Sequence, residues 1–297
     1  MMGSAIPTPA CEHGRMDASP ASIQCSTGPF WTFELEHAFD ILAEAGFKEI
    51  ELMVTRDRAT QEPDLPHRLA EERNIKIASI HAPFLVISKT VWGLDPLGKI
   101  RRGAEMCRAL GCDSMIVHPP YLWERRYARW LGREAEEFSE TTGVTVAVET
   151  MYPRWTAGRR MRGYRWLEAA DLYDSCPTIA MDTSHVTVAR QDILDVYSIL
   201  KDKLVHIHLS DNAGDGRDGH LELEQGVLPI ERFLGEIRRT HYRGAISLEL
   251  AVRKYVKDDR SLVDMLRRNR EYVENVLGRE EKLQKGMPRT KPDQKVG

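Results

Sequence analysis

The chain has 297 residues, of which 42% are hydrophobic and 29% charged, a composition typical of a soluble globular protein with one large core. Its 42 lysine and arginine residues against 45 aspartate and glutamate residues give a net charge of −3, which excludes an overall positive surplus for binding polyanions. The five cysteines form no CxxC pair and no regular framework, so the sequence indicates a reducing compartment.

The two ends of the chain differ in composition from the part between them. Residues 1–20 contain three prolines and scattered charges, with no apolar run long enough for a signal peptide or a membrane span. Residues 279–297 are rich in lysine, glutamine and proline and have almost no large apolar residues. We therefore expect a flexible tail at 1–20, one catalytic domain at 21–278 and a polar basic tail at 279–297, in a cytoplasmic protein without membrane contact.

Between these ends, short apolar runs alternate with longer amphipathic segments. The runs predict eight strands, at 22–26, 49–54, 75–82, 114–118, 145–150, 178–183, 204–209 and 245–250. Each is followed by helix-like sequence, and helices are expected at 33–45, 97–110, 123–140, 164–173, 191–201, 230–240 and 260–277. The first of these precedes Gly46 and the second precedes Gly111, and glycine accepts the left-handed conformation after a helix end at little cost.

Repeated strand–helix alternation is typical of a parallel sheet covered by helices. Eight units favour closure into a single (β/α)8 TIM barrel over an open, doubly wound sheet. An open sheet should also carry a glycine-rich phosphate-binding turn after its first strand, and residues 25–29 do not form one.

Histidines and acids gather at the predicted strand ends, the face on which barrel active sites are built. Three carboxylates, Glu149, Asp182 and Glu249, interrupt apolar strand sequence, and an ionised group there costs several kcal/mol unless it is paired or binds metal. Any one of them could be an isolated ion-paired core residue, but three at strand ends favour a shared site. The histidines at strand ends or just beyond them are His81, His118, His185, His206, His208 and His220.

Spacing ranks these residues. Side chains alternate along a strand, so His206 and His208 share one face; His208, nearer the strand end, is the better ligand, and His206 is expected to pack deeper. The pair Asp218 and His220 is a weak signal by itself, whereas Asp182 with His185 combines a strand acid with a loop histidine. Imidazole and carboxylate without thiolate suit a divalent metal, most readily zinc or manganese, and we expect one to three ions.

Substrate contacts are expected from other polar residues near this face. Residues 152–166 interleave five arginines with four aromatics, which suits phosphate, carboxylate, sugar or base binding, but a solvated loop with a hydrophobic anchor fits equally. Arg154, Trp155 and Arg217 are therefore low-ranking substrate-binding candidates. Glu51, an acid in the second strand, could reach the pocket rim or form a salt bridge at the barrel bottom.

Seven motifs together resemble the xylose isomerase-like barrels, a family that includes sugar isomerases, sugar epimerases and endonuclease IV. They are His81-Ala-Pro-Phe84, Val117-His-Pro-Pro120, Val148-Glu149, Met181-Asp-Thr-Ser-His185, His206-Ile-His-Leu-Ser-Asp211, Asp218-Gly-His220 and Leu248-Glu249. The resemblance covers roughly residues 22–278. In the epimerase branch it implies a metal held by Glu149, Asp182, His208 and Glu249, with His185 contacting the substrate.

In the endonuclease branch the resemblance implies the same first ion and two more. His81 and His118 would join Glu149 on a second ion, and His185, Asp218 and His220 would hold a third. The chain departs from that branch in two places, because it has Ser184 where cysteine is usual and lacks the Gly-x-Gly turn after His220. The chain also lacks the surplus of positive charge that binding to many DNA phosphates requires, although the arginine-rich segment could supply positive charge locally.

These observations favour a metal-dependent isomerase or epimerase that acts on a small sugar or polyhydroxy keto compound through a metal-stabilised enediolate. Glu149 and Glu249 would serve as base and acid, and His185 would stabilise the developing oxyanion. A lyase would use the same intermediate. The alternative is an endonuclease IV-like phosphodiesterase for abasic DNA, the only reading with a nucleic-acid partner, and a third is a barrel kept as a scaffold. The oligomeric state is open, and a homo-oligomer is compatible with the sequence.

Overall fold

The computed structural model describes residues 21–84, 88–156 and 159–278. Within them, eight parallel strands close into a barrel in the order β1-β10-β9-β8-β5-β4-β3-β2, which confirms the predicted (β/α)8 fold. The strands are β1 (Ser22–Ser26), β2 (Glu49–Met53), β3 (Lys76–His81), β4 (Ser114–Val117), β5 (Thr145–Glu149), β8 (Ile179–Asp182), β9 (Leu204–Leu209) and β10 (Ala245–Leu248). The proposed tails lie outside the described residues, and the domain boundaries stay predictions.

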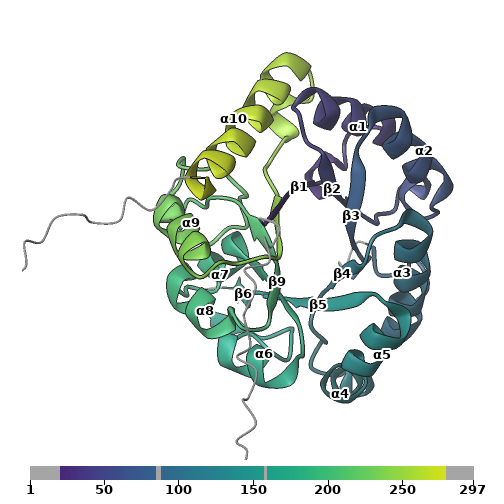
Figure 1. Ribbon diagram of the computed structural model, residues 1–297. Coiled ribbons are helices and arrows are strands. Elements are labelled where there is room, and N and C mark those ends of the chain that lie inside the picture. Colours follow the sequence, from purple (N-terminus) through teal and green to yellow (C-terminus); the bar gives the residue numbers. More distant parts are fainter. Residues whose placement is uncertain (1–20, 85–87, 157–158, 279–297) are drawn as a thin grey trace, which may run out of the picture.

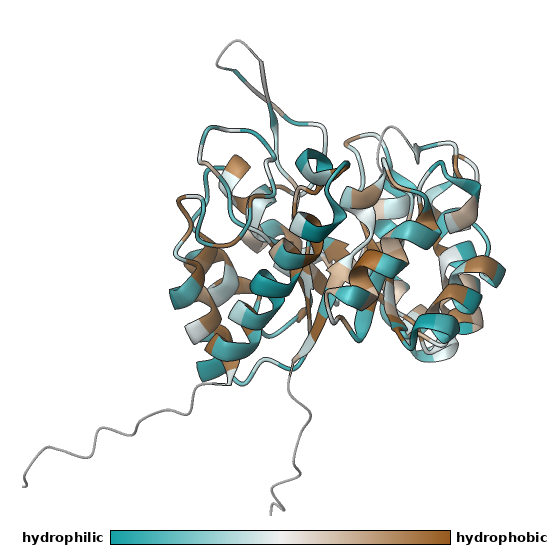
Figure 2. Cartoon of the chain, turned by 90° about the horizontal axis from the view of Figure 1, so that it is seen from above, coloured by the Kyte–Doolittle hydropathy of each residue, from teal (hydrophilic) through white to brown (hydrophobic). Residues whose placement is uncertain are grey.

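Helices form a ring around the strands (Figure 1). They are α1 (Leu35–Glu44), α2 (Asp64–Arg73), α3 (Pro96–Leu110), α4 (Arg125–Arg133), α5 (Ala135–Thr142), α6 (Ala169–Ser175), α7 (Thr183–Val188), α8 (Ile193–Leu200), α9 (Ile230–Arg239) and α10 (Asp259–Leu277). Many mix hydrophilic and hydrophobic residues (Figure 2), and their apolar side chains pack against the strands in one large core. Within the described ranges, none of the helices has the length and apolar character needed to cross a membrane.

The structure corrects three of the local predictions. The helix expected at 123–140 is two helices, α4 and α5, because Glu134 between them has a non-helical backbone conformation. The helix expected at 164–173 starts only at Ala169, since the backbone before it pairs with the loop after β4, where Arg165 N donates to Pro120 O. The arginine-rich segment is more than a loop, because it contains the antiparallel strands β6 (Arg154–Thr156) and β7 (Arg159–Met161).

The barrel interior explains how the strands can carry a polar site. β8 and β9 are neighbouring strands, and their register pairs Asp182 with His208. Two residues before the polar strand ends, the inward positions of β4, β5 and β8 carry Ile116, Ala147 and Ala180, which pack together as a small apolar cluster. The barrel is thus filled below the carboxyl ends of its strands, and the polar side chains are confined to that end and to one part of the interior.

Candidate metal centre

Three carboxylates face one nitrogen of a buried histidine. His208 is fully buried, and its Nδ1 lies 2.7 Å from Glu149 Oε1, 3.4 Å from Glu249 Oε2 and 3.8 Å from Asp182 Oδ2. These residues come from β5, β8, β9 and the end of β10, strands that are neighbours in the barrel. The structure therefore brings together the four residues that the sequence singled out for a central ion.

Asp182 divides its two oxygens between structure and site. Its Oδ1 accepts a hydrogen bond of 2.8 Å from the backbone N–H of His185 and so caps the first turn of α7. Its Oδ2 is buried and has no hydrogen-bond partner among the described residues. Buried carboxylate oxygens without a partner are rare because desolvation is not compensated, and a cation beside Glu149 and Glu249 would satisfy this atom.

Glu149 serves two sides at once. Its Oε1 faces His208, whereas its Oε2 lies 3.4 Å from His81 Nε2 and 3.2 Å from His118 Nε2. All four side chains are buried. A carboxylate with two occupied sides can bridge two cations, so His81, His118 and Glu149 form a second possible ligand group.

Asp218 joins a third group above these. Its Oδ2 lies 3.2 Å from His185 Nε2, and its Oδ1 lies 3.1 Å from His220 Nε2. Ser184 Oγ donates to Asp218 Oδ1 at 2.7 Å, and Asn212 Nδ2 donates to Ser184 Oγ at 2.9 Å. Serine at position 184 thus orients the acid of this group. A cavity of about 490 Å³ opens beside it, lined by His220, Leu221, Glu222, Gln225, Ala251, Arg253 and Lys254.

The outer nitrogens of four histidines are held by hydrogen-bond partners. His81 Nδ1 donates to Ala82 O at 3.0 Å and His185 Nδ1 donates to Thr150 O at 2.9 Å, while His118 Nδ1 lies 3.4 Å from the hydroxyl of Tyr164. His208 Nε2 lies against a carboxylate. Each ring thus turns its other nitrogen toward the carboxylates, which is the orientation that metal-binding histidines need. The donor set fits a divalent metal such as zinc or manganese.

The charges of the cluster perturb its ionisable groups strongly. Burial alone would raise the pKa of Glu149, but His185 and His208 together with hydrogen bonds hold it well below its ordinary value. Burial opposes protonation of His208, yet the carboxylates around it raise its pKa well above the ordinary value. Burial raises the pKa of Glu249. Strongly opposed shifts among buried neighbours are typical of functional sites.

Comparison with known proteins identifies the family. The profile described as xylose isomerase-like TIM barrel matches residues 39–275. The chain belongs to this family. The resemblance read from the motifs is therefore confirmed, and the carboxylate and histidine groups above lie in a xylose isomerase-like barrel.

Relatives of this xylose isomerase-like barrel are known from mycobacteria and from solved structures. An uncharacterized protein of Mycobacterium leprae is 30% identical over 270 residues, 84% of this chain and 96% of that protein. One from Mycobacterium tuberculosis is 31% identical over 244 residues, 76% and 87% of the two chains. A D-tagatose 3-epimerase-like protein has a TM-score of 0.63 at 20% identity, covering 86% of this chain and 98% of its own. The 3-keto-D-glucoside 4-epimerase of E. coli has a TM-score of 0.62 at 16% identity, with 86% and 99% covered. Both solved structures show a shared fold.

The low-ranking substrate contacts fall in different places. Glu51 does not lie at the pocket rim: it is fully buried and hydrogen-bonded to His206 and His208, because its inward position on β2 points it into the barrel. Arg217 is exposed on the loop after β9, with its guanidinium 3.8 Å from Asp215. Arg154 is exposed on β6, and the side chain of Trp155 lies outside the described part of the structure.

Two tyrosines near the cluster were not singled out from the sequence. Tyr152 donates to Asp218 Oδ2 at 3.2 Å, and its ring centroid lies 4.9 Å from that of His185. Tyr164 lies beside His118 and stacks on Tyr121 with ring centroids 4.7 Å apart. Both belong to the arginine-rich segment, residues 152–166. The aromatic residues of this segment were therefore a better guide to the site than its arginines.

Proposed function

We propose that this protein is a divalent-metal-dependent isomerase or epimerase that acts on a small sugar or polyhydroxy keto compound. The observation that carries the proposal is the ring of Glu149, Asp182 and Glu249 around His208 Nδ1, in which Asp182 Oδ2 has no hydrogen-bond partner. Proteins of similar fold are described as a 3-keto-D-glucoside 4-epimerase and a D-allulose 3-epimerase, which supports the same reaction class here.

A divalent ion held by these four residues would bind two neighbouring substrate oxygens and polarise the carbonyl, which acidifies the adjacent C–H bond. Glu149 and Glu249 approach from two sides, since β8 and β9 separate β5 from β10 in the barrel. One carboxylate takes the proton from the carbon next to the carbonyl. For epimerisation the other carboxyl group, in its protonated form, returns a proton to the opposite face of that carbon. For isomerisation the proton returns to the former carbonyl carbon, and the proton of the neighbouring hydroxyl moves to the former carbonyl oxygen.

His185 is placed to stabilise the charge that develops on a substrate oxygen. Its Nδ1 donates to Thr150 O, so the ring orientation is fixed and Nε2 points toward Asp218. The carboxylates of Asp182 and Asp218 overcome the effect of burial and raise the pKa of His185 well above its ordinary value. A protonated Nε2 is thereby available as a hydrogen-bond donor.

The test is proton exchange in deuterated water. Purified protein loaded with Mn²⁺, Co²⁺ or Zn²⁺ is incubated with a panel of ketoses and keto-glycosides, and NMR follows deuterium incorporation next to the carbonyl. We expect exchange that falls by about 10²–10⁴-fold in Glu149→Gln and is unchanged in Glu236→Gln, a half-buried glutamate on α9 that pairs with Arg239 on the outside of the barrel. Exchange by metal-free protein at the full rate would contradict the proposal.

A second candidate, an endonuclease IV-like phosphodiesterase, is favoured by one observation. The groups around Glu149 Oε2 and around Asp218 are both assembled, so nine side chains are arranged as three adjoining ligand groups. Three tightly bound ions per chain and incision of duplex DNA at abasic sites would establish this function. One bound ion and no affinity for DNA would leave only the first candidate.

A further inference from the structure

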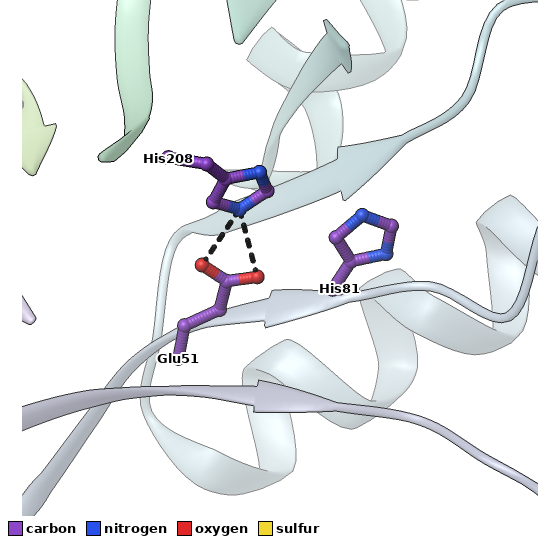
Figure 3. Close-up of side chains that lie close together, drawn as sticks. All are labelled: Glu51, His81 and His208. Carbon is purple, nitrogen blue, oxygen red and sulfur yellow. Dashed lines mark hydrogen bonds and ion pairs between the residues drawn. The ribbon is translucent and has the colours of Figure 1, made fainter. Parts of the chain in front are cut away.

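A buried carboxylate lies behind the proposed metal ligand His208, on the side away from the metal. Glu51 of β2 is fully buried, and both of its oxygens accept from His208 Nε2, at 3.1 and 2.9 Å (Figure 3). We propose that Glu51 is a positioning residue that keeps the proton of His208 on Nε2 and directs Nδ1 to the metal. The inference rests on the metal site of the proposed function and is independent of the substrate.

The burial of Glu51 would cost free energy if the residue served only to stabilise the fold. A buried carboxylate loses its hydration, and a buried ion pair is often no more stabilising than apolar residues of the same volume. On β4, β5 and β8 the barrel uses apolar filling instead, with Ile116, Ala147 and Ala180 two residues before His118, Glu149 and Asp182. At the equivalent position of β9, two residues before His208, the chain has His206 instead.

His206 holds Glu51 from below. Its Nε2 donates to Glu51 Oε2 at 2.9 Å, and its Nδ1 is buried without a hydrogen-bond partner in the described part of the chain. The Glu51 carboxylate can only accept a hydrogen bond, so the His206 ring carries a proton on Nε2. Both histidines of β9 therefore hydrogen-bond to the same carboxylate on β2, and these bonds direct Glu51 Oε1 and Oε2 at the His208 ring.

The other histidines of the cluster have weaker partners. Their outer nitrogens meet a backbone carbonyl at His81 and His185 and a tyrosine hydroxyl at His118. Only His208, among these four, has a carboxylate behind it. A carboxylate behind an imidazole fixes its tautomer and makes its free nitrogen a stronger ligand. This arrangement makes His208 the strongest of the four imidazole ligands.

Glu51, His81 and His208 also lie close enough to form a metal site of their own. That site would need His208 Nε2 as its ligand, which would leave the ring proton on Nδ1, in front of Glu149, Asp182 and Glu249. A neutral imidazole has one lone pair and one N–H, so it cannot serve both sites at once. Moreover, His81 Nε2 points to Glu149 Oε2, 3.4 Å away. The geometry favours the positioning role.

The first test measures the dissociation constant of Co²⁺ for the full-length wild-type protein and two variants. Glu51→Gln keeps the reach of the side chain but removes its charge, and we expect Co²⁺ binding to weaken by about 10–100-fold. Glu49→Gln is the matched control, because Glu49 lies two residues earlier on the same strand face and contacts Ser22 and Lys76 instead. Its Co²⁺ affinity should equal that of the wild type.

The second test needs no variant and remains decisive even where Glu51→Gln fails to fold. Long-range proton–nitrogen NMR of the Zn²⁺-loaded wild type should show His208 with a proton on Nε2 and a metal-shifted Nδ1. Ligation through Nε2 would overturn the proposal and make Glu51 a ligand. Unchanged Co²⁺ affinity in folded Glu51→Gln would overturn the positioning role and leave the metal site standing. A wild type that binds no metal would overturn both.

Discussion

Asp182→Asn separates the structural role of Asp182 from its role at the metal. The asparagine side chain keeps the oxygen that caps α7 through the N–H of His185, a bond of 2.8 Å in the wild type. It replaces Oδ2, which has no hydrogen-bond partner, with an amide nitrogen that cannot ligate a cation. We therefore expect the free energy of unfolding of the metal-free variant to lie within about 1 kcal/mol of that of the metal-free wild type.

The metal-loaded proteins should differ much more. Free metal at 100 times its dissociation constant stabilises a folded protein by about 2.7 kcal/mol. For a chain of this size that is a rise in Tm of roughly 5–10 °C. Loss of a ligand should weaken binding by more than the roughly 10–100-fold seen for residues behind the ligands, so most of this rise disappears in Asp182→Asn.

Thermal unfolding with and without Zn²⁺ or Mn²⁺, together with calorimetric titration, measures both quantities. Asp182→Ala is the matched comparison, because it also removes the cap and should lose about 0.5–2 kcal/mol even without metal. A Tm rise in Asp182→Asn as large as in the wild type would refute the ligand assignment. A metal-free Asp182→Asn variant that is strongly destabilised would show that the carboxylate is needed for ion pairing instead.

Three further predictions concern catalysis, packing and pH. Chelation followed by dialysis should abolish exchange activity, and restored metal should recover it in the wild type but not in Glu149→Gln. Gly226→Ala should lose about 1–3 kcal/mol in urea unfolding, because the new Cβ would lie 2.2 Å from Asn212 O; Gly235→Ala, which meets no atom within 4 Å, should lose nothing. Asp218 overcomes the effect of burial and raises the pKa of His220 from 6.5 to about 9. The resulting stability is complete below pH 6.5 and is lost as pH rises through 9, so metal-free wild type should lose up to about 3 kcal/mol over that window. A His220→Asn variant with the same pH slope would contradict this.

The sequence by itself determined the barrel, and it singled out as candidate metal ligands the residues that meet at His208 Nδ1. Strand residues alternate between faces, so apolar runs broken by Glu149, Asp182 and Glu249 could be recognised as strands that bury acids. His206 and His208 lie on the same face of one strand, and His208 could be ranked higher because it is nearer the carboxyl end of that strand. These patterns are local, so they can be recognised without knowing which strands are neighbours.

Only the tertiary structure decided what lies behind and around those ligands. Glu51 could be read as a rim or bottom residue, and its place behind His208 depends on how β2 and β9 close across the barrel, since the two residues are 157 positions apart in the sequence. The segment before α6 has helical sequence, but it pairs with the loop after β4 and places Tyr164 beside His118. Such contacts come from strand order and barrel closure, which local periodicity does not encode.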